Sequence, residues 1–299
     1  MIRDLNELIR KAKEKPARTM AVAAAEDEHV LKAVRDAVNE RVIIPLLIGD
    51  KAKVEQVAKS IGFDLNGIEL IDNREGGAVS ARLAVAKVKR GEADLVMKGF
   101  VSTADLLKAV LDKETGLRAG RLLSHVAFFQ SPYYHKVFGV TDAAMNIAPD
   151  LEAKIQIIQN AVNACHGIGV ENPKVAVVAA VETVNSKMEA TVHAARLRKM
   201  NRNGVLTRCI VDGPFAIDIA VNREAANHKG IESEVAGDCD LILVPDIEAG
   251  NMLYKALNFL GGAVSAAVVL GASAPIVLTS RSDDERSKLL SIALGACIG

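Results

Sequence analysis

The stretch that decides the fold covers residues 241–255 and reads LILVPDIEAGNMLYK. Its first four residues, 241–244, are all aliphatic, which is typical of a buried strand. Pro245 ends this strand because it has no amide hydrogen to donate to the ladder. Apolar residues then recur at helical spacing, at Met252, Leu253, Ala256, Leu257 and Leu260. The stretch therefore predicts a strand, a short turn and a helix.

Polar side chains gather at the turn between this strand and this helix. Asp246, Glu248 and Asn251 all follow the carboxyl end of the strand. Ligands of open α/β sheets bind at the carboxyl ends of strands, so these three residues are candidates for substrate binding. The alternative is that Asp246 and Glu248 only start the helix, since acids are favoured near the positive end of a helix dipole. The residues alone leave both interpretations open.

The rest of the chain repeats the same alternation of strand and helix, which predicts an α/β fold with a mainly parallel sheet. Strands are expected at residues 19–25, 42–48, 68–71, 93–97, 175–180 and 209–212. Residues 124–131 and 136–140 are expected to form a hairpin. We expect a first α/β domain of residues 1–142 with 275–299, and a second of residues 143–274.

Composition excludes several classes of function. The chain has 299 residues and equal numbers of basic and acidic residues, 37 of each, so nothing indicates nucleic acid or an anionic membrane as a partner. No apolar run reaches the roughly 20 residues that a membrane span needs, and no signal peptide is present. The four cysteines form no CxxC pair, and no Gly-rich dinucleotide motif occurs. We expect a soluble, cytoplasmic protein without a metal site.

A second set of candidates follows the expected strand at residues 93–97. The turn reads KGFVST and contains Lys98, Gly99, Ser102 and Thr103, and a helix is expected after it. A lysine and two hydroxyl groups at a helix N-terminus can bind an anion such as phosphate. The alternative is an ordinary helix capped by one of the hydroxyls, with the lysine lying along the surface.

Two further turns carry isolated candidates. Asn146 ends the string TDAAMN, and Asp212 begins the string DGPFAID. We expect Asp142, in the first string, to hold the turn through its backbone contacts. Asn146 and Asp212 are candidates for substrate binding, although turn chemistry alone also explains an aspartate beside a Gly-Pro pair.

The strongest catalytic candidates are Ser280 and Arg281, which follow a short strand expected at residues 275–278. A guanidinium group matches the geometry of phosphate, and a hydroxyl can donate to a developing oxyanion. Asp283 and Asp284 come next and are candidates for a general base. The alternative is that Ser280 caps the last helix and Arg281 is a surface charge.

These strings together resemble one family. VPDIEAGNMLYKAL, followed by LGGA at residues 260–263, is similar to the signature of the phosphate acetyl and butyryl transferases, and the TDAAMN and DGPFAID strings fit the same family. The match is in register from about Met20 onward and is closer to the butyryl branch. The resemblance implies a two-domain αβα architecture like that of isocitrate and isopropylmalate dehydrogenases, with the active cleft between the domains.

The resemblance also implies an activity. The reaction would be acyl-CoA plus phosphate giving acyl phosphate plus coenzyme A, without a metal or cofactor, in a homodimer or larger assembly. The family's Ser-Arg pair falls on Ser280 and Arg281. The family's catalytic aspartate falls on Ser287 here, so the base stays open between Asp283, Asp284 and Glu285.

Two other functions are compatible with the sequence. One is a metal- and NAD-dependent dehydrogenase of the same fold, which would use Asp212, Asp218 and Asp246 as metal ligands. The other is a module that binds acyl-CoA without turnover. Dependence on a divalent metal would identify the first, and tight binding without catalysis would identify the second.

Overall fold

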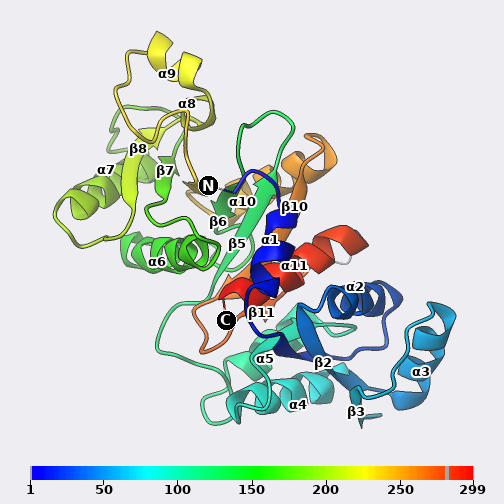
Figure 1. Ribbon diagram of the computed structural model, residues 1–299. Coiled ribbons are helices and arrows are strands. Elements are labelled where there is room, and N and C mark those ends of the chain that lie inside the picture. Colours follow the sequence, from blue (N-terminus) through cyan, green and yellow to red (C-terminus); the bar gives the residue numbers. More distant parts are fainter. Residues whose placement is uncertain (1, 280–282, 299) are drawn as a thin grey trace. The chain divides into compact units, whose positions relative to one another are not determined.

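A computed structural model of the chain describes residues 2–279 and 283–298 (Figure 1). The chain forms two compact units. Unit 1 consists of Met1–Leu5 and Leu122–Ser265, and unit 2 of Asn6–Arg121 and Ala266–Gly299. These bounds differ from the expected domains in three segments: residues 1–5 and 122–142 belong with unit 1, and residues 266–274 with unit 2. Strand pairing explains the segment 122–142, because residues 139–141 pair with residues 241–243.

Unit 2 contains a mainly parallel sheet with the strand order β3-β2-β1-β4-β11-β10. Its strands are β1 (Arg18–Ala23), β2 (Ile43–Gly49), β3 (Glu69–Asp72), β4 (Leu95–Lys98), β10 (Val264–Leu270) and β11 (Ile276–Val277). Strand β10 runs antiparallel to β11, and the other pairs are parallel. Residues 264–270 are mostly apolar, a pattern that fits either a helix or a strand, and they form strand β10.

The helices of unit 2 alternate with its strands, as the sequence pattern predicted. They are α1 (Asn6–Lys13), α2 (Glu28–Asn39), α3 (Lys51–Ser60), α4 (Gly77–Lys89), α5 (Thr103–Val110) and α11 (Glu285–Ile298). Asp27, Asp50 and Ser102 cap three of them, each accepting a hydrogen bond from a first-turn amide. Helix α11 packs against α1 and α2, so the first and last helices of the chain lie side by side in this unit.

Unit 1 has the strand order β5-β6-β9-β7-β8. Its strands are β5 (Ser124–Gln130), β6 (Phe138–Thr141), β7 (Lys174–Val178), β8 (Ile210–Phe215) and β9 (Leu241–Leu243). Strands β5 and β6 form the predicted antiparallel hairpin, and the other neighbours pair in parallel. The stretch at residues 241–255 thus supplies the central strand of this unit, with β6 on one side and β7 on the other.

Five helices belong to unit 1: α6 (Leu151–Gly167), α7 (Glu189–Arg202), α8 (Ile217–Val221), α9 (Arg223–His228) and α10 (Ile247–Phe259). The two short helices α8 and α9 were not expected, because five or six residues carry no helical periodicity that a sequence pattern can reveal. Strand β8 continues three residues beyond its expected end at Asp212, since Phe215 still pairs with Val178.

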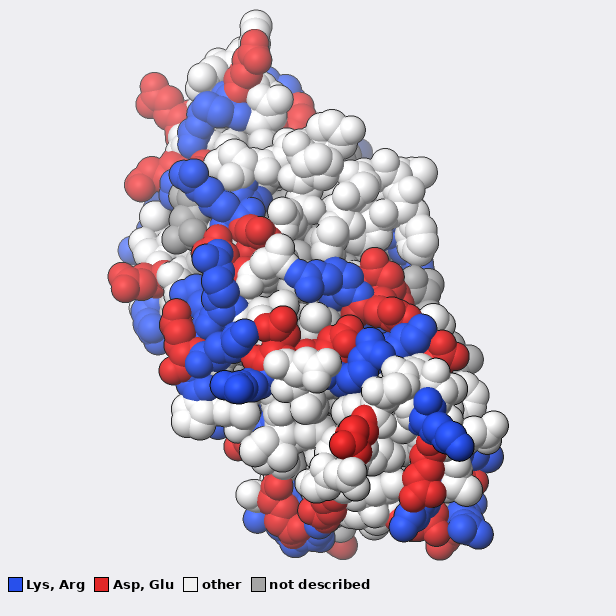
Figure 2. Space-filling model, turned by 45° about the vertical axis from the view of Figure 1, so that its right-hand side comes forward, with Lys and Arg blue, Asp and Glu red and all other residues white. Residues whose placement is uncertain are grey.

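The surface agrees with the balanced composition. Figure 2 shows basic and acidic side chains interleaved over much of one face, beside a broad area without charged residues. In the part of the chain that the structure describes, no helix combines the length and the apolarity needed to cross a membrane.

Candidate functional site

The turn after β4 is built tightly against the end of β1. The Gly99 amide donates to the Ala23 carbonyl at 2.9 Å, and a Cβ atom on Gly99 would lie 2.1 Å from the Ala24 carbonyl oxygen. Only glycine fits this close approach. Lys98, just before it, is 7% exposed, and its Nζ lies 3.5 Å from the Gly99 carbonyl oxygen. The structure therefore holds the Lys98 ammonium group at the carboxyl edge of the sheet in unit 2.

Ser102 has the capping role that the sequence left as an alternative. Its hydroxyl accepts from the Asp105 amide at 3.0 Å and donates to the Asp105 carboxylate at 2.7 Å. Thr103 is the first residue of α5, so its backbone lies at the helix N-terminus. The hydrogen-bond donor of the Ser102 hydroxyl and one of its acceptor positions are thus used in capping α5.

Glu26, which lies three residues after β1, was not among the site residues predicted from the sequence. The Oε2 atom of Glu26 is buried and has no hydrogen-bond partner within the described residues. It packs so closely on Gly49 that a Cβ atom there would lie 2.0 Å away. Burial raises the pKa of the Glu26 carboxyl group above its ordinary value. A buried carboxyl group with a raised pKa, placed where the strands of a sheet end, is a candidate for proton transfer. From the sequence alone, Glu26 is indistinguishable from an acid that starts a helix.

We expect Glu26→Gln to stabilise the protein increasingly as the pH rises from about 4.5 toward 7. Because the pKa of Glu26 is raised in the folded state, the folded protein holds this proton more tightly than the unfolded chain does. The wild type therefore loses stability as the pH rises through this window, and the glutamine variant does not incur this loss. Urea unfolding of both proteins between pH 4.5 and 8 measures the difference. If the difference in unfolding free energy between the two proteins stays constant from pH 4.5 to 8, the pKa of Glu26 is not raised in the folded protein.

In unit 1, two turns at the carboxyl edge carry most of the remaining candidates. Asp142 accepts from the amides of Ala144 and Met145 at 2.9 and 3.0 Å, which agrees with its expected role in the turn. Asn146 donates to the Leu123 carbonyl at 2.9 Å and to the Asp142 carboxylate at 2.5 Å. Both donor hydrogens of the Asn146 amide are thus used, one within the turn and one by the segment that precedes β5.

The second of these turns starts helix α10. Asp246 caps the helix by accepting from the Ala249 amide at 2.9 Å, and Glu248 lies exposed in the first turn. The Asn251 amide approaches the Ala143 carbonyl oxygen at 3.4 Å. The structure therefore brings the turn at residues 142–146 and the turn at residues 246–251 together. Asp246 has the helix-starting role that the sequence left as one alternative.

Asp212 lies inside β8 rather than at its end. Its carboxylate accepts from the Gly213 amide at 2.8 Å and from the Ser233 hydroxyl at 2.6 Å, and the Arg198 guanidinium lies 3.5 Å away. The expectation that the strand ends at Asp212 was wrong, because the strand continues to Phe215. These contacts tie Asp212 to the loop that contains Ser233.

The candidates near the C-terminus are only partly described. Ser280 and Arg281 lie outside the described residues. The Asp284 carboxylate accepts from the Ser287 amide at 2.7 Å, so it caps helix α11. The backbone carbonyl of Asp283 accepts from the Lys288 ammonium group. Neighbouring Glu285 pairs with Lys32 at 3.0 Å, which joins the start of α11 to α2.

A buried lysine and histidine pair was also missed. Lys154 on α6 is 4% exposed, and its Nζ lies 3.0 Å from Nδ1 of His193 on α7. Burial lowers the pKa of both groups, and the Lys154 charge lowers the pKa of His193 further. The two residues are 39 positions apart and lie on separate helices, so no local pattern predicts their contact.

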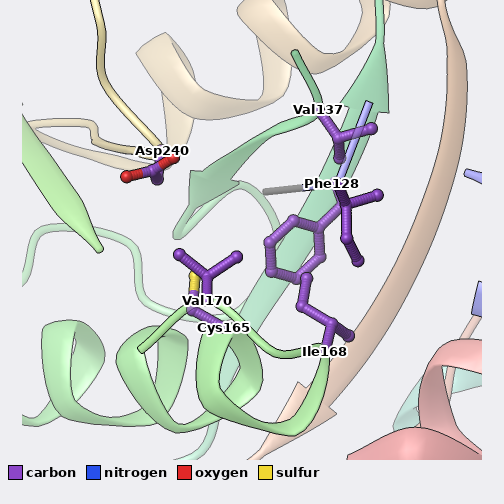
Figure 3. Close-up of a pocket in the computed structure, with 7 residues that line it drawn as sticks. Phe128, Val137, Cys165, Ile168, Val170 and Asp240 are labelled. Atoms are coloured by element: carbon purple, nitrogen blue, oxygen red, sulfur yellow. The ribbon is translucent and has the colours of Figure 1, made fainter. Parts of the chain in front are cut away.

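One small cavity lies in the core of unit 1 (Figure 3). Its volume is about 10 Å³, and its lining residues are Ile2, Phe128, Val137, Cys165, Ile168, Val170 and Asp240. This space accommodates about one water molecule and is far too small for an acyl-CoA. Among the residues with described positions, no group of three His, Cys, Asp or Glu side chains is arranged to hold a metal ion.

Comparison with known proteins places the chain in a family. The family model described as Phosphate acetyl/butaryl transferase matches residues 4–81 and 78–296. The phosphate butyryltransferase of Clostridium acetobutylicum is 46% identical over 298 residues, which is 100% of this chain and 99% of that protein. The phosphate acetyltransferase of Thermotoga maritima is 45% identical over 294 residues, 98% of each chain.

Solved structures give the same result. A branched-chain phosphotransacylase from Enterococcus faecalis V583 superposes with a TM-score of 0.84 at 31% identity, over 94% of this chain and 98% of that one. A putative 4-hydroxythreonine-4-phosphate dehydrogenase from Salmonella typhimurium shares the fold alone, with a TM-score of 0.60 at 11% identity over 95% of this chain and 100% of that one. Because the sequence matches cover almost the whole chain, the protein belongs to the phosphate acetyl/butyryl transferase family.

Proposed function

We propose that the protein transfers an acyl group between coenzyme A and phosphate, with butyryl or a similarly short chain as the preferred group. The observation that carries this proposal is the 46% identity to a phosphate butyryltransferase over essentially the full length of both proteins. The acetyl-transferring relative is almost as similar, at 45%. The preference for butyryl therefore rests on the short loops and on the string SPYYHKVFGVTDAAMNIAPDL, which favour the butyryl branch.

The chemistry assigns roles to the residues around the last strand. A phosphate oxygen attacks the thioester carbonyl, the carbon–sulfur bond breaks, and coenzyme A leaves as a thiolate that takes a proton. We assign Arg281 to hold the phosphate and Ser280 to donate to the oxyanion of the tetrahedral intermediate. In the reverse direction a carboxylate removes the thiol proton, and we assign this role to Asp283 or Asp284.

We assign the turn after β4 to the phosphate group. Lys98 supplies a buried positive charge, and Gly99 lets the backbone come close. Thr103 starts α5, and the amides of a helix N-terminus favour an anion. Ser102 supports this site by capping the helix and is not assigned a direct contact.

We assign the candidates of unit 1 to substrate contacts through their backbone and through the lone pairs of their carboxylate or amide oxygens. These are Asn146, Asp212, Asp246 and Asn251. Each has a structural hydrogen bond as well, so substitutions are expected to lower stability together with affinity. Glu248 lies on the exposed face of α10 in its first turn, and we assign it to the same substrate contacts.

Several finer expectations belong to the same proposal. They are an architecture like that of isocitrate and isopropylmalate dehydrogenases with a substrate cleft between two domains, a cytoplasmic location and a homodimeric or larger assembly. Acyl-CoA and inorganic phosphate are the proposed substrates. The proposed reaction needs no metal or cofactor, because guanidinium and amide groups supply the positive charge.

A comparison of acyl donors tests this proposal. Thiol release is measured with butyryl-CoA and acetyl-CoA at saturating phosphate, with and without a chelator. We expect a higher kcat/KM with butyryl-CoA and no effect of the chelator. A higher kcat/KM with acetyl-CoA contradicts the butyryl preference, and activity that needs a divalent metal and NAD supports a dehydrogenase instead.

A further inference from the structure

Lys154 and His193 form a buried contact that the acyl transfer chemistry does not use. Lys154 lies on α6 and is 4% exposed, and His193 lies on α7 and is 7% exposed. Their nitrogen atoms, Nζ and Nδ1, are 3.0 Å apart. Because an ammonium group can only donate a hydrogen bond, His193 must accept it at Nδ1, and the ring must then be neutral with its hydrogen on Nε2.

The ammonium group of Lys154 has no carboxylate in direct contact among the residues with described positions. Burial lowers its pKa most, and the more distant charges of Glu189, Asp246 and Asp150 raise it in part. Burying a charge without an ion partner costs stability. Ionisable groups with pKa values perturbed in this way are concentrated at functional sites, which indicates a role for this lysine.

The first turns of three helices lie around this contact. Lys154 itself lies in the first turn of α6, which Asp150 caps, and His193 lies one turn into α7. The Ile247 amide, in the first turn of α10, donates to the Ile147 carbonyl at 2.9 Å. This bond ties the start of α10 to the segment that precedes α6. The Lys154 charge is therefore placed close to the residues that begin α10.

Asp246 is a candidate for substrate binding on which this charge acts. One of its carboxylate oxygens accepts from the Ala249 amide and caps α10. The other accepts no hydrogen bond from the described part of the chain, so it can accept one from a substrate. A nearby positive charge favours the ionised form of a carboxylate and attracts it. This attraction is stronger in a buried site than in water, because the local dielectric constant is lower.

We propose that Lys154 is a positioning residue for the binding of acyl-CoA. Held by its hydrogen bond to His193, the ammonium group keeps the Asp246 carboxylate ionised and oriented at the start of α10, where that carboxylate accepts a hydrogen bond from the substrate. This role rests on the proposed function, since Lys154 acts through a residue that is assigned to the substrate.

The hydrogen bond between Lys154 and His193 depends on pH. A protonated His193 cannot accept it, and protonation would place two positive charges 3.0 Å apart. Burial lowers the pKa of His193 below its ordinary value of 6.5, and the Lys154 charge lowers it further. Of the other charges that face the ring, Arg196 also lowers this pKa, while Glu189 and Asp150 raise it in part. The hydrogen bond is therefore intact at neutral pH and is lost at a pH below 6.5, where affinity for acyl-CoA should fall.

A double-mutant cycle on Lys154 and Asp246 tests this role. The dissociation constant of butyryl-CoA is measured by isothermal titration calorimetry at pH 7.5, without phosphate. Lys154→Met removes the ammonium charge, and Asp246→Asn removes the carboxylate charge but keeps a good N-cap. We expect each change to raise the dissociation constant about tenfold, and the double variant to bind no more weakly than Asp246→Asn alone. A lysine that only stabilises the fold would give effects that multiply, to about 100-fold in the double variant.

His193→Asn tests the pH dependence. An asparagine oxygen occupies the place of Nδ1, because both atoms are bonded to Cγ, and it accepts a hydrogen bond at every pH. We expect this variant to have wild-type affinity at pH 7.5. In the wild type, the pH at which affinity falls should match the titration of His193 followed by NMR, and this fall should be absent in His193→Asn.

Lys174→Met is the control, since it removes an ammonium group that binds Asp238 in the same unit, and it should leave the dissociation constant unchanged. Thermal melting shows that each variant is folded. The role of Lys154 is overturned by an unchanged dissociation constant in Lys154→Met, by effects that multiply in the double variant, or by a fall in affinity at acid pH that His193→Asn retains. A wild type that does not bind butyryl-CoA overturns the proposed function as well, whereas binding with multiplying effects overturns only the role of Lys154.

Discussion

Arg281→Ala is expected to lower kcat/KM for phosphate by about 100- to 1,000-fold while leaving the protein folded. The proposed role of Arg281 is to hold phosphate against the thioester carbonyl, and alanine removes both the positive charge and the fork of donors. Arg281→Lys should recover only a small part of this loss, because an ammonium group cannot bind phosphate through two parallel hydrogen bonds. Initial rates of thiol release at varied phosphate concentration measure the effect.

Ser280→Ala and Arg286→Ala complete this series. Ser280→Ala should lower kcat with little change in KM, since a hydroxyl that donates to the oxyanion acts mainly in the transition state. Arg286 is an exposed arginine five residues further on and serves as the control for loss of a positive charge near this segment. If Arg286→Ala lowers the rate as much as Arg281→Ala does, the assignment to Arg281 is wrong.

Lys136→Met is expected to destabilise the protein by about 3–5 kcal/mol, the range found when one partner of a buried ion pair is removed. The Lys136 side chain is 2% exposed, and its ammonium group lies 2.7 Å from Asp240 and 3.0 Å from the carboxylate of Asp238. It also donates to the Asp238 carbonyl at 3.0 Å. Without the lysine, the Asp240 carboxylate, which is 13% exposed, keeps the Lys174 backbone amide as its donor. Urea unfolding at pH 7 measures the loss.

Lys174→Met is the matched control for this network. Lys174 also binds Asp238, but its side chain is 27% exposed, so its removal should cost about 1 kcal/mol. Equal losses in the two variants contradict the account of Lys136 as the buried centre of the network.

The same network predicts a dependence of stability on pH. Burial alone would raise the pKa of Asp238, but hydrogen bonds from its three basic partners outweigh it and hold the pKa well below the ordinary value. The resulting stability is complete above about pH 4 and is lost as the pH falls below that value. The loss between pH 4 and pH 2 should be smaller in Lys136→Met than in the wild type.

The sequence predicted the parallel units and the β5–β6 hairpin because these depend on patterns within a few residues. Aliphatic runs form β1, β2 and β9, and the acids after them cap the helices that follow. The Lys136 network could not be predicted in this way. Its partner Asp238 lies 102 residues further along the chain, and only the pairing of β6 with β9 brings the two together.

The candidate site was harder to predict because the same residue types serve two purposes. Ser102 and Asp246 each follow a strand and precede a helix, where a cap and a ligand contact require the same oxygen atom. Glu26 and Lys154 could not be predicted as site residues for a different reason. Burial shifts the pKa of each group, and burial is a property of the folded chain that no local sequence pattern shows. The exposure of Met252 on α10 likewise depends on the fold, because the opposite side of this helix, at Gly250, packs on the Asp142 turn.

The most direct test of the central claim is to incubate the purified protein with butyryl-CoA, with and without inorganic phosphate, and to follow both products. We predict that free coenzyme A appears only when phosphate is present and that phosphorus NMR shows butyryl phosphate in equal amount. Release of coenzyme A without phosphate, or with butyrate in place of butyryl phosphate, would show a hydrolase. No release from a folded protein that binds butyryl-CoA would contradict the assignment of acyl transfer to this chain.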